Sequence, residues 1–284
     1  MPLAPSPLNA PAISKPSRLW GKLIFWMMSL ALLSTCHPTA PPLNLSALEA
    51  EIHQRTNQLR KEQQLTPLQS LDMLSTLARA HSEDMSARGF FEHVNPDGLA
   101  PHDRLSYGLP EVINMYSGEN LAKHSQDDFD TSALATELMR LWIASPDHRA
   151  QLTTPEFRHL GVGVFQDEAG IVYVTQTFAT LVAQLTEPIP DKVRANTPFR
   201  LSFTFLEAFD REELSAFLHT SHGFARIEGP YGVYYKGKGP VPIQWLDNTH
   251  FEVRIPTELG PGRYRVRLGR KERFFEKDFV VEVS

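Results

Sequence analysis

The apolar positions between residues 46 and 143 recur mostly at helical spacing. Ser46 and Glu49 form a capping-box pattern, which predicts a helix from there to about residue 62. Thr66-Pro67 predicts the start of a second helix, and Gly89 marks its end. One apolar stripe runs along this second helix: Leu71, Leu74, Ala78, His81 and Met85. These spacings favour a helical layer that packs one face against a core.

The next part of the chain changes from helical to strand periodicity. A helix is expected over residues 131–143, with Leu134, Leu138, Leu141 and Trp142 facing inward. Another helix begins at Ser145, with Pro146 in its first position. Two β-rich runs, 161–165 and 171–178, then predict a hairpin.

The chain beyond residue 186 reads as a separate all-β module. Prolines in 186–190 mark the boundary, so one domain is expected over 46–185 and the module over 186–284. Short strands are expected at 199–205, 231–235, 251–255, 264–268 and 279–283, with a short helix at 212–218. The run Pro261–Val266 resembles Ig-like modules of exported bacterial proteins, so a small Ig-like sandwich is expected.

The first 36 residues have the pattern of an export signal. A basic stretch with Lys15, Arg18 and Lys22 precedes an apolar run over 23–33, which is shorter than a membrane-spanning helix. Leu33–Cys36 resembles a bacterial lipobox, in which the cysteine receives a lipid. An ordinary cleaved signal and a short uncleaved anchor are the alternatives. We therefore expect an extracytoplasmic protein, either a membrane-anchored lipoprotein or a secreted or periplasmic one, with 37–45 as a proline-rich tether.

Charge and cysteine content narrow the classes of function. The 284 residues carry a net charge of −5, and 10 basic against 19 acidic side chains fall within 41–185. Nucleic acid is therefore not an expected partner, because phosphate binding needs a basic face. The single cysteine, Cys36, excludes an intramolecular disulfide and a thiolate zinc cluster.

Candidate chemistry lies in three places along the 46–185 region. His93 directly precedes the turn sequence 95–98, and Glu119 and Asn120 follow Gly118 in an expected Gly-centred loop. His148 falls in the first turn of its helix, where the helix dipole should keep it neutral, as metal ligation requires. His81 is interpreted as a core residue, because it lies on an apolar stripe.

Five ordered motifs carry a family resemblance. They are Phe91-x-His93-x-x-Pro96-Asp97-Gly98, Gly118-Glu119-Asn120, Trp142-x-x-Ser145-Pro146-x-His148-Arg149, Gly161-Val-Gly163 and Tyr173-x-x-Gln176-x-Phe178. This order resembles the CAP superfamily, which includes cysteine-rich secretory, antigen 5 and pathogenesis-related proteins, in its cysteine-poor bacterial branch. The resemblance implies an α+β fold, a three-layer α-β-α sandwich.

The resemblance also implies a cleft lined by two histidines and two glutamates. His93, His148 and Glu119 occupy three of these positions, whereas Ser145 stands at the fourth. Several family members bind a divalent metal such as zinc through the two histidines. Zinc or another divalent cation is therefore the one cofactor expected, with Glu119 as a ligand or as a partner of the ligands.

Two functions remain open from the sequence. The first is a non-catalytic envelope protein that binds a small apolar molecule, a glycan or a protein partner, with Asn120 and Ser145 in the cleft. The second is a metal-dependent hydrolase that uses His93, His148 and Glu119. The chain has no HExxH or GxSxG motif and no nucleophilic cysteine in its expected mature domains, which favours the first. The arginines at 263, 265 and 267 are interpreted as a solvated strand face rather than a site for an acidic polymer.

Overall fold

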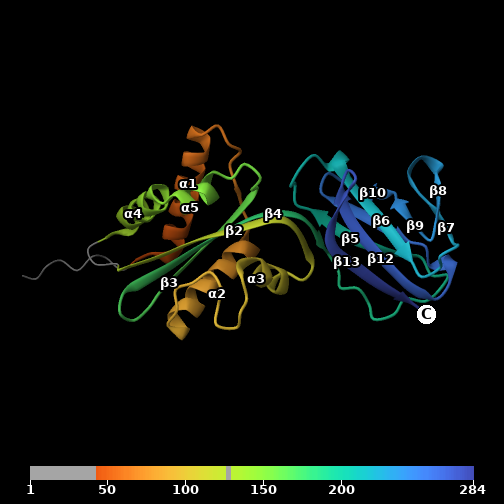
Figure 1. Ribbon diagram of the computed structural model, residues 1–284, viewed down its shortest axis with the longest axis horizontal. Coiled ribbons are helices and arrows are strands. Elements are labelled where there is room, and N and C mark those ends of the chain that lie inside the picture. The colour runs from red at the N-terminus through yellow and green to blue at the C-terminus, as the bar shows by residue number, and fades with distance from the viewer. Residues whose placement is uncertain (1–42, 126–128) are drawn as a thin grey trace, which may run out of the picture. The chain divides into compact units, whose positions relative to one another are not determined.

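The computed structural model describes residues 43–125 and 129–284, so the predicted export signal, Cys36 and most of the predicted tether lie outside it. The first part of the described chain is mixed α and β (Figure 1). Its helices are α1 Leu45–Glu62, α2 Asp72–Arg88, α3 Pro101–Gly108, α4 Thr131–Ala144 and α5 Pro146–Thr153. Its strands are β1 Gln69–Ser70, β2 Val112–Ser125, β3 His159–Gln166 and β4 Ile171–Leu185. The α+β class predicted from the sequence is confirmed.

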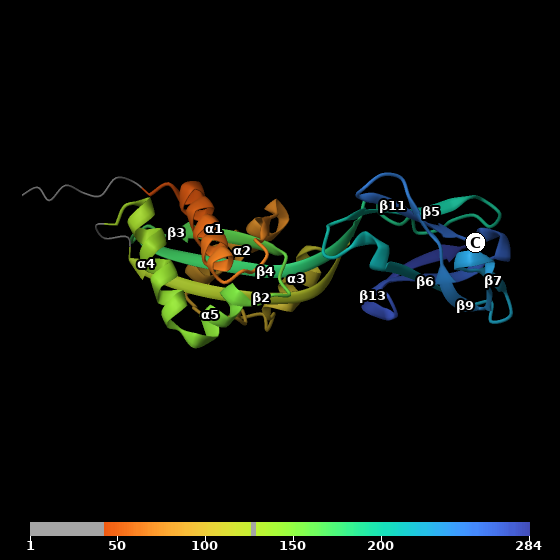
Figure 2. The same cartoon turned by 90° about the horizontal axis from the view of Figure 1, so that it is seen from above.

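The helices cover both faces of the sheet. Strand β4 pairs antiparallel with β2 on one side and with β3 on the other, and β1 adds to β3 in parallel. Helices α1, α4 and α5 lie on one face, and α2 and α3 lie on the other (Figures 1 and 2). Each face has its own apolar core, the larger one beneath α1 and α4. This is the expected three-layer arrangement.

The close approach of α2 to β3 explains the Gly161-Val-Gly163 motif. A Cβ atom at Gly163 would lie 2.0 Å from the Arg79 backbone nitrogen, and one at Gly161 would lie 2.2 Å from the Leu74 carbonyl carbon. Real side chains do not fit at such distances. The two glycines therefore allow the backbone of α2 to rest directly on the strand, while Val162 packs into the core on the opposite face.

Several predicted helix ends need correction. Asn44 caps α1 by accepting from the Ala47 N–H, so Ser46 lies inside the helix and the predicted capping box is wrong. The second helix begins at Asp72 rather than near residue 66, because Gln69–Ser70 pairs with β3. Its predicted end is confirmed, since Gly89 takes the left-handed conformation with φ 68°. Leu141, predicted to face inward, is 38% exposed.

Most strands of the last hundred residues form two sheets around one apolar core. One four-stranded sheet has the order β13-β12-β6-β9, and strands β5, β11 and β10 continue from the end of β4. Tyr264, Val266 and Leu268 face this core, each fully buried. The strand bounds are β5 Phe199–Phe205, β6 Leu214–Thr220, β9 Lys238–Val241, β10 Ile243–Trp245, β11 His250–Ile255, β12 Gly262–Arg270 and β13 Arg273–Val283.

Two sequence predictions in this module need correction. The predicted helix at 212–218 is mostly strand β6, preceded by a 3-10 turn at Arg211–Glu213, because Leu214, Ala216 and Leu218 alternate into the core. The predicted strand at 231–235 is a second 3-10 turn, Pro230–Gly232, followed by strand β8 Tyr234–Lys236. Strand β8 pairs with β7 Arg226–Glu228 in a two-stranded sheet. The Ig-like type of the module remains a prediction.

Among the described residues, no helix is both long enough and apolar enough to span a membrane.

Candidate functional site

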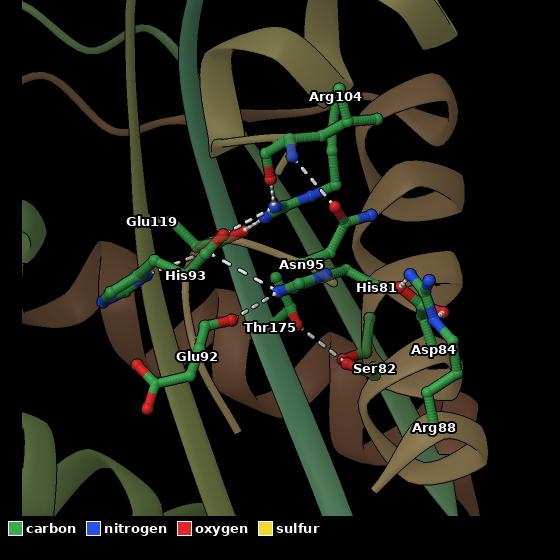
Figure 3. A network of polar contacts seen from close by, with 12 residues as sticks. His81, Ser82, Asp84, Arg88, Glu92, His93, Asn95, Arg104, Glu119 and Thr175 are labelled. Carbon is green, nitrogen blue, oxygen red and sulfur yellow. Dashed lines mark hydrogen bonds and ion pairs between the residues drawn. The ribbon is translucent and has the colours of Figure 1, made fainter. Parts of the chain in front are cut away.

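A polar cluster gathers where the loop after α2 meets the middle of β2 (Figure 3). The side-chain oxygen of Asn95 accepts from the N–H groups of Asp97 and Leu99, which fixes the turn predicted at 95–98. From the first turns of α3, Arg104 donates to the carbonyl oxygens of His93, at 2.6 Å, and Leu99, at 2.9 Å. The loop that carries His93 is therefore held by both its own turn and a neighbouring helix.

Glu119 is the centre of this cluster. It is only 7% exposed, yet both of its carboxylate oxygens have partners. His93 Nδ1 donates to Oε1 at 2.9 Å, and the Arg104 guanidinium donates to Oε2 at 2.5 Å. Burial of a carboxylate is costly unless it is paired and hydrogen-bonded, and here both conditions are met. The side chains of His93 and Glu119, predicted to share a site, are brought into direct contact.

The backbone around Glu119 is not the predicted loop. Residues 117–121 lie inside the continuous strand β2 and pair with β4 in register. Gly118 serves close packing rather than a turn, because a Cβ there would lie 2.1 Å from Gln151 Oε1 and 2.7 Å from the Phe157 ring. A rigid strand therefore presents Glu119, which gives the carboxylate a fixed position.

Two members of the cluster, His81 and Arg104, were not predicted from the sequence. His81 is buried as predicted, and its Nε2–H donates to the Glu92 carbonyl oxygen at 3.2 Å. The same nitrogen lies 3.9 Å from Glu119 Oε1, and His81 Nδ1 has no hydrogen-bond partner among the described residues. Burial lowers the pKa of His81 and opposes its protonation, even though Glu119 lies close by. Residue spacing alone gives no signal for either contact.

His93 and His148 have opposite pKa shifts. The hydrogen bond to Glu119 raises the pKa of His93, whose side chain is 51% exposed. Burial lowers the pKa of His148, and the nearby charge of His93 lowers it further. The predicted direction for His148 agrees, but the main causes are burial and His93 rather than the helix dipole.

Asn120 and Ser145 differ from their predicted roles. Asn120 is fully buried, and its amide donates to the His148 carbonyl oxygen at 3.1 Å and to Gln176 Oε1 at 3.2 Å. Gln176 in turn donates to Thr56 on α1, so a buried polar chain links α1, the sheet and the start of α5. Ser145 occupies the N-cap position of α5, but its side chain makes no capping hydrogen bond.

The described residues do not complete a three-ligand metal site. Structural and catalytic zinc sites usually have at least three protein ligands. The described ranges hold no group of three or more His, Cys, Asp and Glu side chains arranged to hold a metal ion. Glu119 already uses one oxygen for Arg104 and the other for His93, which leaves His93 and His148 as the available donors.

Comparison with known proteins decides the family of this region. Residues 53–178 match the model of the Cysteine-rich secretory protein family, CAP. This region is a CAP domain. His93, Glu119 and His148 all lie within the matched range.

Two proteins of Bacillus subtilis are similar to part of this chain. The uncharacterized protein YkwD is 34% identical over 139 residues, which is 49% of each chain. The uncharacterized membrane protein YlbC is 32% identical over 130 residues, 46% of this chain and 34% of YlbC. The chain thus spans about half the length of the first relative and a third of the second.

A solved structure of an extracellular SCP-domain protein from Bacillus anthracis is 30% identical. The match covers 48% of this chain and 41% of the Bacillus anthracis chain, with a TM-score of 0.40.

Proposed function

We propose that this is an exported cell-envelope protein whose CAP domain is a non-catalytic binding module. The surface around His93 and His148 would bind a small apolar molecule, a glycan or a protein partner. The observation that carries this proposal is the engagement of both oxygens of Glu119, by His93 and by Arg104. Ser145 stands where the family resemblance implies the second glutamate of the cleft, so that position has no carboxylate.

The engagement of Glu119 argues against the hydrolase alternative. A general base must accept a proton from water or substrate within hydrogen-bond reach. The ion pair with Arg104 stabilises the charged carboxylate and occupies one oxygen, while His93 occupies the other. Because His93 Nδ1 faces Glu119, its Nε2 is the ring nitrogen left for a ligand, on a side chain that is half exposed. This arrangement suits recognition of a hydrogen-bonding group.

Turnover assays separate the two functions. Wild type and Glu119→Gln would be compared on peptide, ester and glycoside substrates, with and without added zinc. We expect no turnover by wild type above that of the variant. A wild-type rate that falls about 100-fold or more in Glu119→Gln would contradict the proposal, since removal of a general base costs that much. Binding is measured separately, by cosedimentation of the protein with purified cell envelopes. The variant His93→Ala/His148→Ala should sediment with the envelopes less than wild type does.

A divalent ion at His93 and His148 remains a prediction. The two imidazoles would have to share the ion with water or with a donor from the ligand. Zinc titration of wild type against His93→Ala/His148→Ala tests it. Equal zinc affinities would show that these histidines hold no metal.

The position at the envelope rests on the N-terminal sequence. We propose that the apolar run 23–33 directs export and that Cys36 carries the lipid that anchors the chain to a membrane, with the Ig-like module as a further exported domain. Mass measurement of the mature N-terminus and palmitate labelling test the anchor. A mature chain that begins elsewhere than Cys36, or labelling that persists in Cys36→Ser, would contradict it.

A further inference from the structure

The outer face of the β13-β12-β6-β9 sheet carries one arginine that differs from its neighbours. Arg263 pairs with Glu282 and Arg267 pairs with Asp278, each at 2.6 Å. Arg265 lies between them on β12, where its neighbour on β13 is Val280. Within the described part of the chain, Arg265 has no acidic partner.

Two more basic side chains lie in a row with Arg265 across the neighbouring strands of the sheet. Its cross-strand neighbour on β6 is His219, and the neighbour of His219 on β9 is Lys238. All three residues are exposed, and none of them has an acidic partner among the described residues. Neighbouring strands are about 5 Å apart, so the row offers basic groups at a regular spacing across three strands.

A hollow lined by two aromatic rings lies beside this row. Phe217 and Phe274 have ring centroids 5.0 Å apart, and Phe274 is 40% exposed. Together with His219, Arg265 and the Arg267–Asp278 pair, they line a hollow of about 160 Å³. Exposed aromatic surface beside an unpaired arginine is typical of a binding site rather than of a solvated strand face.

The chemistry of the row and the hollow selects a ligand class. A guanidinium without a protein partner can bind a carboxylate or phosphate through two parallel hydrogen bonds. The aromatic rings supply an apolar surface on which the C–H face of a sugar ring can pack. A regular row of basic groups suits a polymer with repeated anions. We propose that the row Arg265–His219–Lys238, with the hollow at Phe217 and Phe274, binds an acidic glycan.

The proposal revises the interpretation of this strand as solvated. Three alternating arginines on an exposed strand are ordinary, and two of them are indeed neutralised by acidic neighbours. The pairing leaves one unpaired arginine, and the sheet register aligns it with basic groups from two other strands. The sequence shows the arginines, but it does not show which of them is unpaired.

The test uses the mature full chain and defined oligosaccharides. Oligogalacturonate is the acidic glycan probe, an uncharged galactose oligomer is the neutral probe, and poly-glutamate is an anion without sugar rings. We expect Arg265→Gln to raise the Kd for oligogalacturonate about tenfold or more, as loss of a charge-assisted contact does. Phe274→Ala should weaken oligogalacturonate binding while leaving poly-glutamate binding unchanged.

The matched control is Arg254→Gln. Arg254 lies on β11, is exposed, and pairs with Glu258 at 2.7 Å, so the variant changes net charge equally away from the row. Its Kd for oligogalacturonate should equal that of wild type. Equal Kd values for Arg265→Gln and Arg254→Gln would overturn the proposal, as would equal binding of the neutral probe. Poly-glutamate binding that weakens with Phe274→Ala as much as glycan binding would overturn the assignment to a sugar.

A further variant separates this inference from the function proposed for the CAP domain. His93→Ala/His148→Ala changes the CAP surface and leaves the row intact, so it should keep wild-type affinity for oligogalacturonate. Loss of glycan binding in this variant would place the glycan site in the CAP domain and contradict the present assignment.

Discussion

Replacement of Arg104 by methionine should destabilise the CAP domain through the carboxylate it leaves behind. The side chains of Arg104 and Glu119 are 14% and 3% exposed, so the pair is largely removed from water. Loss of one partner of a buried pair costs about 3–5 kcal/mol, and the partial exposure of Arg104 favours the lower end, about 3 kcal/mol. Part of this loss comes from the two carbonyl oxygens that Arg104 also binds, those of His93 and Leu99.

A double-mutant cycle isolates the ion pair from these other contacts. Arg104→Met, Glu119→Gln and the double variant would be prepared without residues 1–36, which contain Trp20 and Trp26, and unfolded in urea. Trp142 fluorescence is then the signal in a Trp245→Phe background. Trp142 is 1% exposed in the CAP core, whereas Trp245 belongs to the β module. We expect a coupling free energy of about 2 kcal/mol between the two positions.

The control for this cycle is an equally short but exposed pair. Arg88 and Asp84 lie one helical turn apart at 2.5 Å, with side chains 34% and 26% exposed. Arg88 also pairs with the more exposed Asp97 at 2.8 Å, so Arg88→Met removes two solvent-screened contacts and should lower the free energy of unfolding much less than Arg104→Met. Coupling near zero for Arg104 and Glu119, or an equal loss in Arg88→Met, would refute the argument that burial makes this pair important.

Three further predictions concern the fold and its pH dependence. Arg60 is fully buried and donates to the carbonyl oxygens of Leu152 and Thr154 at the C-terminal end of α5. Arg60→Met should therefore lower the unfolding free energy in urea by about 3 kcal/mol or more, and a loss below about 1 kcal/mol would contradict this. Gly163→Ala should lower the melting temperature strongly because its Cβ would meet the α2 backbone, whereas Gly223→Ala, with nothing within 4 Å, should not; equal melting temperatures would contradict the packing argument. Burial lowers the pKa of His148 in the folded state, so the unfolded chain binds more protons, and the stability that this contributes is present above the unfolded pKa and lost as pH falls. His148→Ala should therefore flatten the dependence of the unfolding free energy on pH between pH 7 and 5. An unchanged slope would contradict the shift.

The sequence pattern predicts a structural element well where residues close in sequence determine it, as in helix α2. The apolar stripe of α2 and its glycine end were read correctly, because both depend on residues within one helix. The start of α2 was placed too early, because Gln69–Ser70 pairs with β3, about 90 residues away in sequence. The glycine at 118 was read as a chain break, whereas it admits the side chains of Gln151 and Phe157. Local sequence does not distinguish these two uses of glycine.

The candidate site was predicted only in part, for a similar reason. The ordered motifs placed His93 and Glu119 together, and the structure confirms their contact. Arg104 and His81 were not assigned to the site, because nothing in their own helices distinguishes them from a surface arginine and a core histidine. Their roles follow from the packing of α2 and α3 against one face of the sheet, which brings both beside Glu119.

The central claim is that Glu119 is committed to His93 and Arg104. The most direct test is an NMR titration of the His93 imidazole in wild type and in Glu119→Gln. The account predicts a His93 pKa above its ordinary value in wild type, a proton on Nδ1, and a lower pKa in the variant, because the hydrogen bond to the carboxylate raises the pKa. An identical His93 pKa in the two proteins would contradict the account and leave Glu119 free for other chemistry.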